Sequence, residues 1–137
     1  LGATRVINGK EKDAVEEIMK LTNGVGVEKV FETAGSPFTI QQTPYIVKRA
    51  GTITLVGISA QEKIEYNFAQ IMDKEPTIKS VFRYRNIYPQ AIAAIADGTI
   101  DVSGIVTHEF AFDDIQEAFD CAINNKDDVV KAVIKIK

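Results

Sequence analysis

One short run of residues, Gly-Thr-Ile-Thr-Leu-Val-Gly-Ile at positions 51–58, constrains the fold more than any other stretch. Its apolar and β-branched residues follow one another instead of alternating with charged ones. This pattern is typical of an inner strand in a parallel sheet that helices cover. Open α/β sheets bind ligands at the carboxyl ends of their strands. Gly57, near the end of the run, is therefore the first candidate for a position where a ligand approaches the backbone.

Strand and helix signals alternate along the rest of the chain. Further strands are predicted at residues 4–8, 27–33, 77–83 and 129–136, which are rich in β-branched or apolar residues. Short, glycine-containing connections and right-handed crossovers between parallel strands place helices on both sides of one sheet. The sequence therefore predicts an α/β fold with a doubly wound parallel sheet.

The predicted helices begin at residues that can cap them. Asp13 is followed three residues later by Glu16, which is the spacing of a capping box. The Ser-Pro pair at 36–37 predicts a helix that runs to Gly51 and bends at Pro44. A short helix or irregular cover is expected at residues 66–73, and two later helices are expected to be capped by Asn86 and Asp113, the former ending at Gly98.

Composition excludes several classes of function. The 137 residues include 16 basic and 19 acidic side chains, a net charge of -3 with both signs dispersed, so no basic face for nucleic acid or an anionic membrane is expected. No apolar stretch approaches the length of a membrane span, and no signal-peptide pattern is found. A single cysteine forms no internal disulfide, which fits a reducing compartment. We therefore expect a cytoplasmic protein without nucleic-acid or membrane partners.

Two residues that often bind metals or react with substrates have little support here. His108 is the only histidine and has no cysteine or carboxylate pair nearby in the sequence, so it is interpreted as structural. Cys121 lies beside the apolar stripe of a predicted helix and is interpreted as a packing residue. The Gly-Val-Gly segment at 24–26 follows a helix and precedes a strand, the reverse of the order in a phosphate-binding loop. No catalytic or metal-ligating residue is predicted.

The glycine-ended strands at 30–35 and 51–58, followed by Val-Phe-Arg-Tyr at 81–84, resemble the second half of the cofactor domain in medium-chain, zinc-dependent alcohol dehydrogenases. Residues 81–110 most resemble the sorbitol (polyol) dehydrogenase branch. The resemblance implies a partial Rossmann-type domain at residues 1–110, without its first βαβ segment. Residues 111–137 would be the helix and strand that return to the catalytic, GroES-like domain. The chain starts at Leu1, without methionine, and is expected to be a fragment.

The resemblance also implies a set of contact residues. Backbone groups at the two strand ends 56–58 and 81–82 would hold the carboxamide of NAD, which needs a donor and an acceptor in fixed geometry. The residues after the strand at 27–33 would let the nucleotide approach closely, and a guanidinium and a phenol would face polyol hydroxyls. The implied cofactor contacts are Ala34, Gly35, Val56, Gly57, Ile58, Val81, Phe82 and Arg83, and the implied substrate contacts are Arg83 and Tyr84.

Three family features are missing from the sequence: the Gly-x-Gly-x-x-Gly turn, the acidic residue that follows it and the catalytic zinc ligands. The expected parent protein is an NAD-dependent (or NADP-dependent), zinc-dependent polyol or secondary-alcohol dehydrogenase and a homo-oligomer. Its zinc would act as a Lewis acid on the alcohol oxygen. The isolated chain is expected to be inactive, with a central strand left as an unpaired edge that could pair with another molecule.

Two other classes of function stay open. A zinc-free quinone reductase that uses NADPH would share the glycine-ended strands, and a non-catalytic binding or interaction domain would need none of the missing parts. From pattern alone, Gly57 could simply end a strand, and Arg83 with Tyr84 could be a solvated strand end. The zinc content of the complete protein separates the first alternative from the alcohol dehydrogenase interpretation.

Overall fold

The computed structural model describes residues 2–136 and divides into two compact units. The N-terminal unit is Thr4–Arg85, and the C-terminal unit holds the residues from Asn86 onward together with the few residues before Thr4. Within the described range, no helix has the length and apolar character needed to cross a bilayer.

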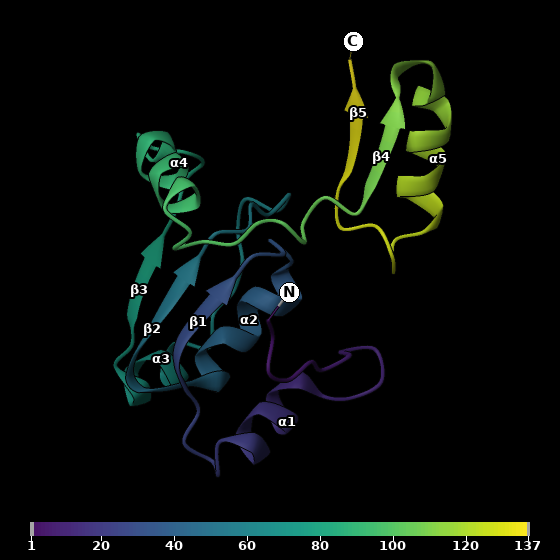
Figure 1. Cartoon of the computed structure of the whole chain (residues 1–137). Coiled ribbons are helices and arrows are strands. Elements are labelled where there is room, and N and C mark those ends of the chain that lie inside the picture. Colours follow the sequence, from purple (N-terminus) through teal and green to yellow (C-terminus); the bar gives the residue numbers. More distant parts are fainter. Residues whose placement is uncertain (1, 137) are drawn as a thin grey trace. The chain divides into compact units, whose positions relative to one another are not determined.

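The N-terminal unit is built on a three-stranded parallel sheet with the order β1-β2-β3. Strand β2 contains most of the apolar run at 51–58 and pairs with a strand on each side, so the predicted inner strand is confirmed (Figure 1). In chain order the elements are α1 (Ala14–Leu21), β1 (Val27–Glu32), α2 (Pro37–Ile46), β2 (Val47–Leu55), α3 (Phe68–Lys74) and β3 (Thr77–Ser80).

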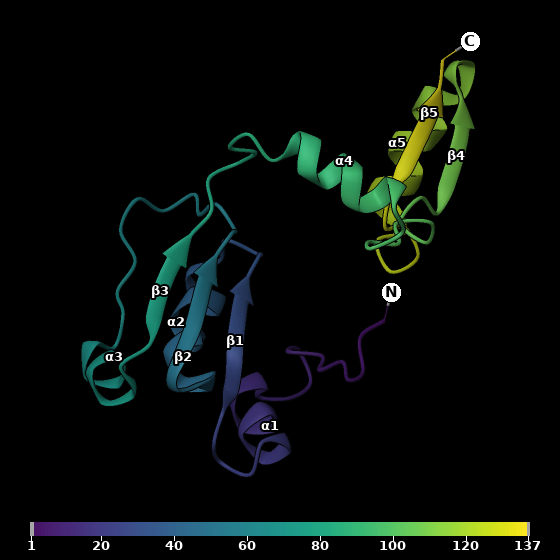
Figure 2. The ribbon, with the colours of Figure 1, turned by 60° about the vertical axis from the view of Figure 1, so that its left-hand side comes forward.

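The core of this unit lies between the sheet and its helices. Val30 of β1 is in register with Ile53 of β2, and both are buried beside Val47. Helix α2 packs against β1 and β2, and α3 packs against β2, so both cover the same face of the sheet (Figure 2). Phe31, next to Val30 along the strand, points to the opposite face and is exposed. Within this unit, helices therefore cover one face, whereas the sequence predicted both.

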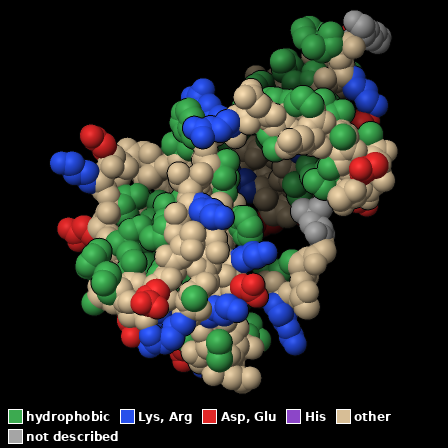
Figure 3. Space-filling model, turned by 90° about the vertical axis from the view of Figure 1, so that its left-hand side faces the viewer, with side chains coloured by type: hydrophobic (Ala, Val, Ile, Leu, Met, Phe, Trp, Pro, Cys, Tyr) green, Lys and Arg blue, Asp and Glu red, His purple; other side chains and the backbone are tan. Residues whose placement is uncertain are grey.

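Large hydrophobic side chains remain exposed outside this small core. Phe68 and Met72 on α3 are exposed, as is Ile78 on β3. Figure 3 shows hydrophobic side chains at the surface, with basic and acidic side chains interspersed among them. The packing of the unit therefore depends on few residues, and these centre on β1 and β2.

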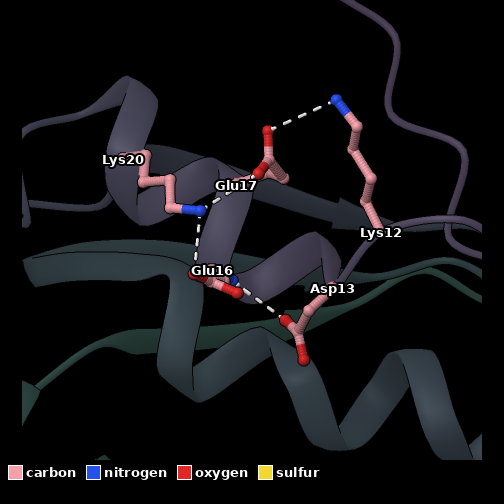
Figure 4. A network of polar contacts seen from close by, with 5 residues as sticks. All are labelled: Lys12, Asp13, Glu16, Glu17 and Lys20. Carbon is pink, nitrogen blue, oxygen red and sulfur yellow. Dashed lines mark hydrogen bonds and ion pairs between the residues drawn. The ribbon is translucent and has the colours of Figure 1, made fainter.

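Helix α1 begins as predicted. The Asp13 side chain is the N-cap, and its Oδ1 accepts a hydrogen bond from the Glu16 N–H at 2.9 Å (Figure 4). The side chain of Glu16 forms an ion pair with Lys20 at 2.8 Å, and Glu17 also pairs with Lys20 at 3.3 Å. Both partners are one turn away on the same helix face. The predicted cap is confirmed, and the carboxylate of Glu16 stabilises the body of the helix.

The predicted end of the second helix is wrong. Helix α2 ends at Ile46 instead of Gly51, and β2 begins at once with Val47 in register with Val27 of β1. An irregularity in the register follows before the pairing resumes at Thr52. A Cβ on Gly51 would lie 2.7 Å from Cγ2 of Val47, so the chain needs a glycine there. Pairing with β1 overrides the helical pattern at this position.

Residues 4–8 form no strand, contrary to the sequence prediction. Val6 is 87% exposed. A strand forms only where a neighbour accepts its backbone hydrogen bonds, and no strand of the described chain lies beside this segment. Strand β1 is therefore at the edge of the three-stranded sheet. Pairing of this edge with another molecule stays a prediction.

The C-terminal unit contains a second, two-stranded parallel sheet. Strands β4 and β5 pair along their whole length, α5 packs against both, and the ion pair Lys135–Glu109 at 2.5 Å joins them (Figure 1). The sequence did not predict β4, because it is short and polar at two of four positions. The elements are α4 (Tyr88–Ala96), β4 (His108–Ala111), the 3-10 helix η1 (Phe112–Asp114), α5 (Ile115–Asn124) and β5 (Ala132–Lys135).

Two of the predicted caps in this unit are wrong by one residue. Ile87 and not Asn86 is the N-cap of α4, and Asn86 has a φ of 55° in the turn before it. Asp113 lies inside η1, so that Asp114 is the N-cap of α5. Gly98 follows α4 with a φ of 79°, as predicted for a glycine that ends a helix. The assignment of residues 111–137 to a separate catalytic domain stays a prediction.

Candidate functional site

The residues implied in cofactor and substrate contacts lie where the three parallel strands of the N-terminal unit end. Residues 33–35 follow β1, residues 56–58 follow β2, and we refer to these two segments as the paired exits. Residues 81–84 follow β3 and are called the β3 exit. All three strands point in the same direction, so the exits lie together at the carboxyl ends of the strands (Figure 2).

A buried carboxylate organises the first of the paired exits. Glu32 is the last residue of β1 and only 4% exposed. Its Oε1 accepts hydrogen bonds from the N–H groups of Ala34 and Gly35, both at 3.0 Å, and from Oγ1 of Thr39 at 2.7 Å. Oε2 accepts a second, longer bond from the Gly35 N–H at 3.2 Å. These bonds to a charged acceptor hold the turn between β1 and α2 in one conformation.

Glu32 is absent from the contact residues predicted from the sequence. A signal was present: an acidic residue ends an apolar strand and is followed closely by glycine. A carboxylate that is buried needs hydrogen-bond donors, and the N–H groups of a tight turn are a common source. Burial itself was not visible in the sequence, because it depends on α2 and β2.

The second paired exit packs directly on the first. The N–H groups of Val56 and Gly57 both donate to the backbone carbonyl of Glu32, at 2.8 and 2.9 Å. A Cβ on Gly57 would lie 2.1 Å from the Gly35 nitrogen and 2.8 Å from Oε2 of Glu32. Gly57 therefore allows protein backbone to approach protein backbone, and no side chain fits there without a shift of one exit.

Position 35 also requires a glycine. Its φ of 67° lies in the left-handed region, which glycine adopts at little cost. A Cβ there would lie 2.5 Å from the carbonyl oxygen of Ile58. Gly35 is buried, whereas its neighbour Ala34 and Ile58 in the opposite exit are exposed. The two glycines thus interlock, and Ala34 and Ile58 beside them face solvent.

The β3 exit is more open. The Val81 N–H donates to the carbonyl of Leu55 at 2.9 Å, and this bond continues the pairing of β2 with β3. Phe82 is 67% exposed, and the guanidinium carbon of Arg83 lies 5.3 Å from the centre of its ring. Arg83 has a φ of 54°, which is uncommon for a residue with a side chain. Tyr84 is exposed as well, so this exit presents side chains to solvent.

The hydrogen bonds at these exits leave a mixed set of backbone groups for a ligand. The N–H groups of Val56, Gly57 and Val81 already donate within the protein. Within residues 2–136, no hydrogen bond uses the carbonyl oxygen of Gly57 or the N–H of Phe82. These groups follow the last register pair of two adjacent strands. One donor and one acceptor on adjacent strand ends are the kinds of group that a carboxamide requires.

No metal site is formed by the described part of the chain. Across residues 2–136, no three or more His, Cys, Asp or Glu side chains are grouped so that they could hold a metal ion. The ring of His108 stacks on Phe110, and its Nδ1 lies 3.0 Å from Oγ1 of Thr107. The thiol of Cys121 on α5 lies 3.6 Å from Nδ2 of Asn125, the C-cap of that helix. The donor set of these residues does not fit zinc.

Similarity to known proteins covers almost the whole chain. The family model described as "Zinc-binding dehydrogenase" matches residues 1–97. An uncharacterized zinc-type alcohol dehydrogenase-like protein of Escherichia coli strain K12 is 46% identical over 136 residues, which are 99% of this chain and 39% of that protein. Sorbitol dehydrogenase of Bacillus subtilis strain 168 is 37% identical over 134 residues, or 98% of this chain and 38% of the enzyme.

Solved structures agree with these relatives. The crystal structure of 2R,3R-butanediol dehydrogenase from Bacillus subtilis matches with a TM-score of 0.79 and 31% identity, over 96% of this chain and 38% of that one. The predicted α/β fold with Rossmann-type relatives is thus confirmed, and so is the resemblance to medium-chain zinc alcohol dehydrogenases. The chain spans 38 to 39% of the length of these two curated relatives. On the family match and these relatives together, the chain belongs to the zinc-binding dehydrogenase family.

Proposed function

We propose that the protein containing this chain transfers hydride between a secondary alcohol or polyol and NAD. The observation that carries the proposal is the acceptor and donor pair of Gly57 and Phe82 at two adjacent strand ends. A chain 37% identical to a sorbitol dehydrogenase over 98% of its length supports the alcohol class. When bound, the nicotinamide ring accepts or gives the hydride.

In the proposed reaction, the residues of this chain bind and orient the cofactor and the substrate. The Gly57 carbonyl would accept a hydrogen bond from the carboxamide nitrogen of the cofactor, and the Phe82 N–H would donate one to the carboxamide oxygen, so that the two groups would orient the nicotinamide ring. Ala34 and Gly35 let the nucleotide lie close to the backbone of the first paired exit. The side chains of Arg83 and Tyr84 hydrogen-bond to hydroxyl groups of the substrate, where a guanidinium fork suits neighbouring hydroxyls. Zinc enters the proposal through the family alone.

The complete gene product is the material for the test. Its zinc content is measured by mass spectrometry, and NAD⁺ or NADP⁺ reduction is followed with sorbitol, xylitol, 2,3-butanediol and ethanol. We expect bound zinc, oxidation of the polyols or the diol in preference to ethanol, and loss of turnover after chelation. A zinc-free protein that oxidises NADPH with quinones would instead favour the reductase branch, and binding of neither cofactor would favour a non-catalytic domain.

The 137-residue chain on its own is proposed to be inactive. It spans less than two fifths of the curated relatives, and its described residues offer no metal site. We also propose that the complete protein is a homo-oligomer. Turnover assays on the isolated chain, and light scattering on the complete protein, test these two statements separately.

A further inference from the structure

Glu32 differs from the other acidic residues of the described chain in its surroundings. It is 4% exposed, and its carboxylate accepts only from neutral donors: two backbone N–H groups and a hydroxyl. None of the ion pairs within residues 2–136 involves it. Glu28 on the same strand has a side chain that is 72% exposed and pairs with Lys48 at 3.5 Å. A buried carboxylate with this many aligned donors holds those donors firmly.

The same residue joins both paired exits. Its side chain fixes the N–H groups of Ala34 and Gly35, while its backbone carbonyl accepts from Val56 and Gly57. Gly35 in turn leaves no room for a Cβ on Gly57. A movement of the first exit is therefore transmitted to the second by direct contact. The carbonyl of Gly57, which accepts no hydrogen bond within residues 2–136, lies on this second exit.

We propose that Glu32 is a positioning residue for the nicotinamide cofactor. Its carboxylate holds the first of the paired exits, residues 33–35, and through Gly35 it holds the backbone at Gly57 in the orientation that receives the carboxamide. Glu32 does not touch the cofactor in this scheme and acts through the two exits. The inference rests on the proposed function, because Glu32 would support the same cofactor site from beneath the two exits.

The variant Glu32→Gln tests this with little change in volume. A glutamine side chain has one acceptor oxygen, so the second carboxylate contact to the Gly35 N–H is replaced by an opposing NH₂ group. In the complete gene product, we expect the Kd for NADH, measured by fluorescence titration, to rise about tenfold, as loss of one hydrogen bond to a charged group would produce. The KM for NAD⁺ should rise in parallel, with kcat and the alcohol KM changed much less.

A second measurement does not depend on activity or on bound cofactor. Amide hydrogen exchange in the cofactor-free protein should become faster at Ala34 and Gly35, and also at Val56 and Gly57, although the backbone carbonyl that accepts from the latter two is unchanged. Glu28→Gln, on the same strand, is the matched control and should alter neither NADH binding nor exchange at these amides. Should Glu32→Gln fail to fold, Thr39→Val removes one donor to the carboxylate and should raise the Kd for NADH in the same direction by a smaller factor.

The outcomes separate the inference from the proposed function. Wild-type protein that binds neither NADH nor NADPH would overturn the proposed function and the inference with it. Wild-type protein that binds NADH, with Glu32→Gln binding it equally well, would overturn the inference alone. A lower melting temperature and faster exchange with an unchanged Kd for NADH would likewise show that Glu32 only stabilises the fold. A raised Kd together with faster exchange in both exits supports the inference.

Discussion

The paired exits and the β3 exit end neighbouring strands but are built in different ways. In the paired exits, a buried carboxylate and two interlocked glycines leave no space for an additional atom. In the β3 exit, one backbone bond continues the sheet, and the side chains of Phe82 and Arg83 stack over each other in solvent. The first arrangement suits a contact made by backbone, which is the same for any substrate. The second suits recognition by side chains, which can differ between related enzymes.

Gly57→Ala is expected to have the largest effect, because it disrupts the contact between the paired exits. The new Cβ would lie 2.1 Å from the Gly35 nitrogen, so one exit has to move. We expect a loss of about 3 kcal/mol in the free energy of unfolding, since the clash is with backbone that cannot rotate away. NADH binding should fall below detection in the complete protein. Urea unfolding and fluorescence titration measure the two effects.

Gly9→Ala is the matched control for this change. No φ in the left-handed region is found at Gly9, and an added Cβ would meet no atom within 4 Å. Its free energy of unfolding should stay within about 0.5 kcal/mol of wild type. Equal stability of the two alanine variants would contradict the account of the interlocked glycines.

Arg83→Asn should affect the substrate more than the cofactor. Asparagine tolerates the left-handed backbone that Arg83 adopts at a φ of 54°, so the fold is preserved while the guanidinium is removed. The KM for a polyol should rise about tenfold, the usual effect of losing a hydrogen bond to a charged group. Steady-state kinetics on the complete protein measure this, and Arg85→Gln serves as the control at a neighbouring arginine. A raised Kd for NADH with an unchanged polyol KM would place this side chain at the cofactor instead.

Lys74→Met should lower stability without touching either kind of exit. Nζ of Lys74 donates to the carbonyls of Tyr45 at 2.5 Å and Val47 at 2.7 Å, where α2 passes into β2. This junction is at the opposite end of β2 from Gly57. Loss of the two bonds should cost about 1 kcal/mol in the free energy of unfolding, with no change in the Kd for NADH. A weaker NADH affinity in this variant would mean that general loss of stability explains the effects at the exits.

The smallest expected effect is on the pH dependence of stability. Burial lowers the pKa of Lys74 below its ordinary value of 10.5, so in the window just below pH 10.5 the unfolded chain binds more protons than the folded one. The contribution of Lys74 to stability therefore increases as pH rises through that window. Lys74→Met should remove this increase, which after solvent screening is less than about 0.5 kcal/mol.

Lys20 gives the opposite sign in the same experiment. Hydrogen bonds to Glu16, the larger cause, and to Glu17 raise the pKa of Lys20. Its contribution to stability is therefore present below pH 10.5 and is lost as pH rises through the higher pKa of the folded state. Lys20→Met should therefore flatten a decrease where Lys74→Met flattens an increase. Urea unfolding of wild type and both variants across the alkaline range measures this. The difference in unfolding free energy between variant and wild type should change with pH in opposite directions for the two variants, and changes in the same direction would contradict the assignment.

Local sequence signals predicted a good part of the fold. Asp13 caps α1 through a hydrogen bond from the N–H three residues along the chain, and Gly98 follows α4 with a positive φ that depends only on the glycine itself. Strand signals were less reliable, because a strand forms only when it pairs with another segment of the chain. Residues 4–8 have strand-like composition and no neighbour, whereas β4 is weakly strand-like and forms because β5 lies beside it. Helix α2 ends early because β1 pairs with the following residues.

The candidate site divides along the same line. The sequence by itself determined which strands end in glycine and which exit carries an arginine and a tyrosine, since these are properties of short segments. Only the tertiary structure decided that Gly35 and Gly57 meet, and that Glu32 lies buried beneath both. Glu32 and Gly57 are brought together by the crossover of α2 and the pairing of β1 with β2. Contacts between residues so far apart in sequence come from packing of the whole unit, and local propensities do not encode them.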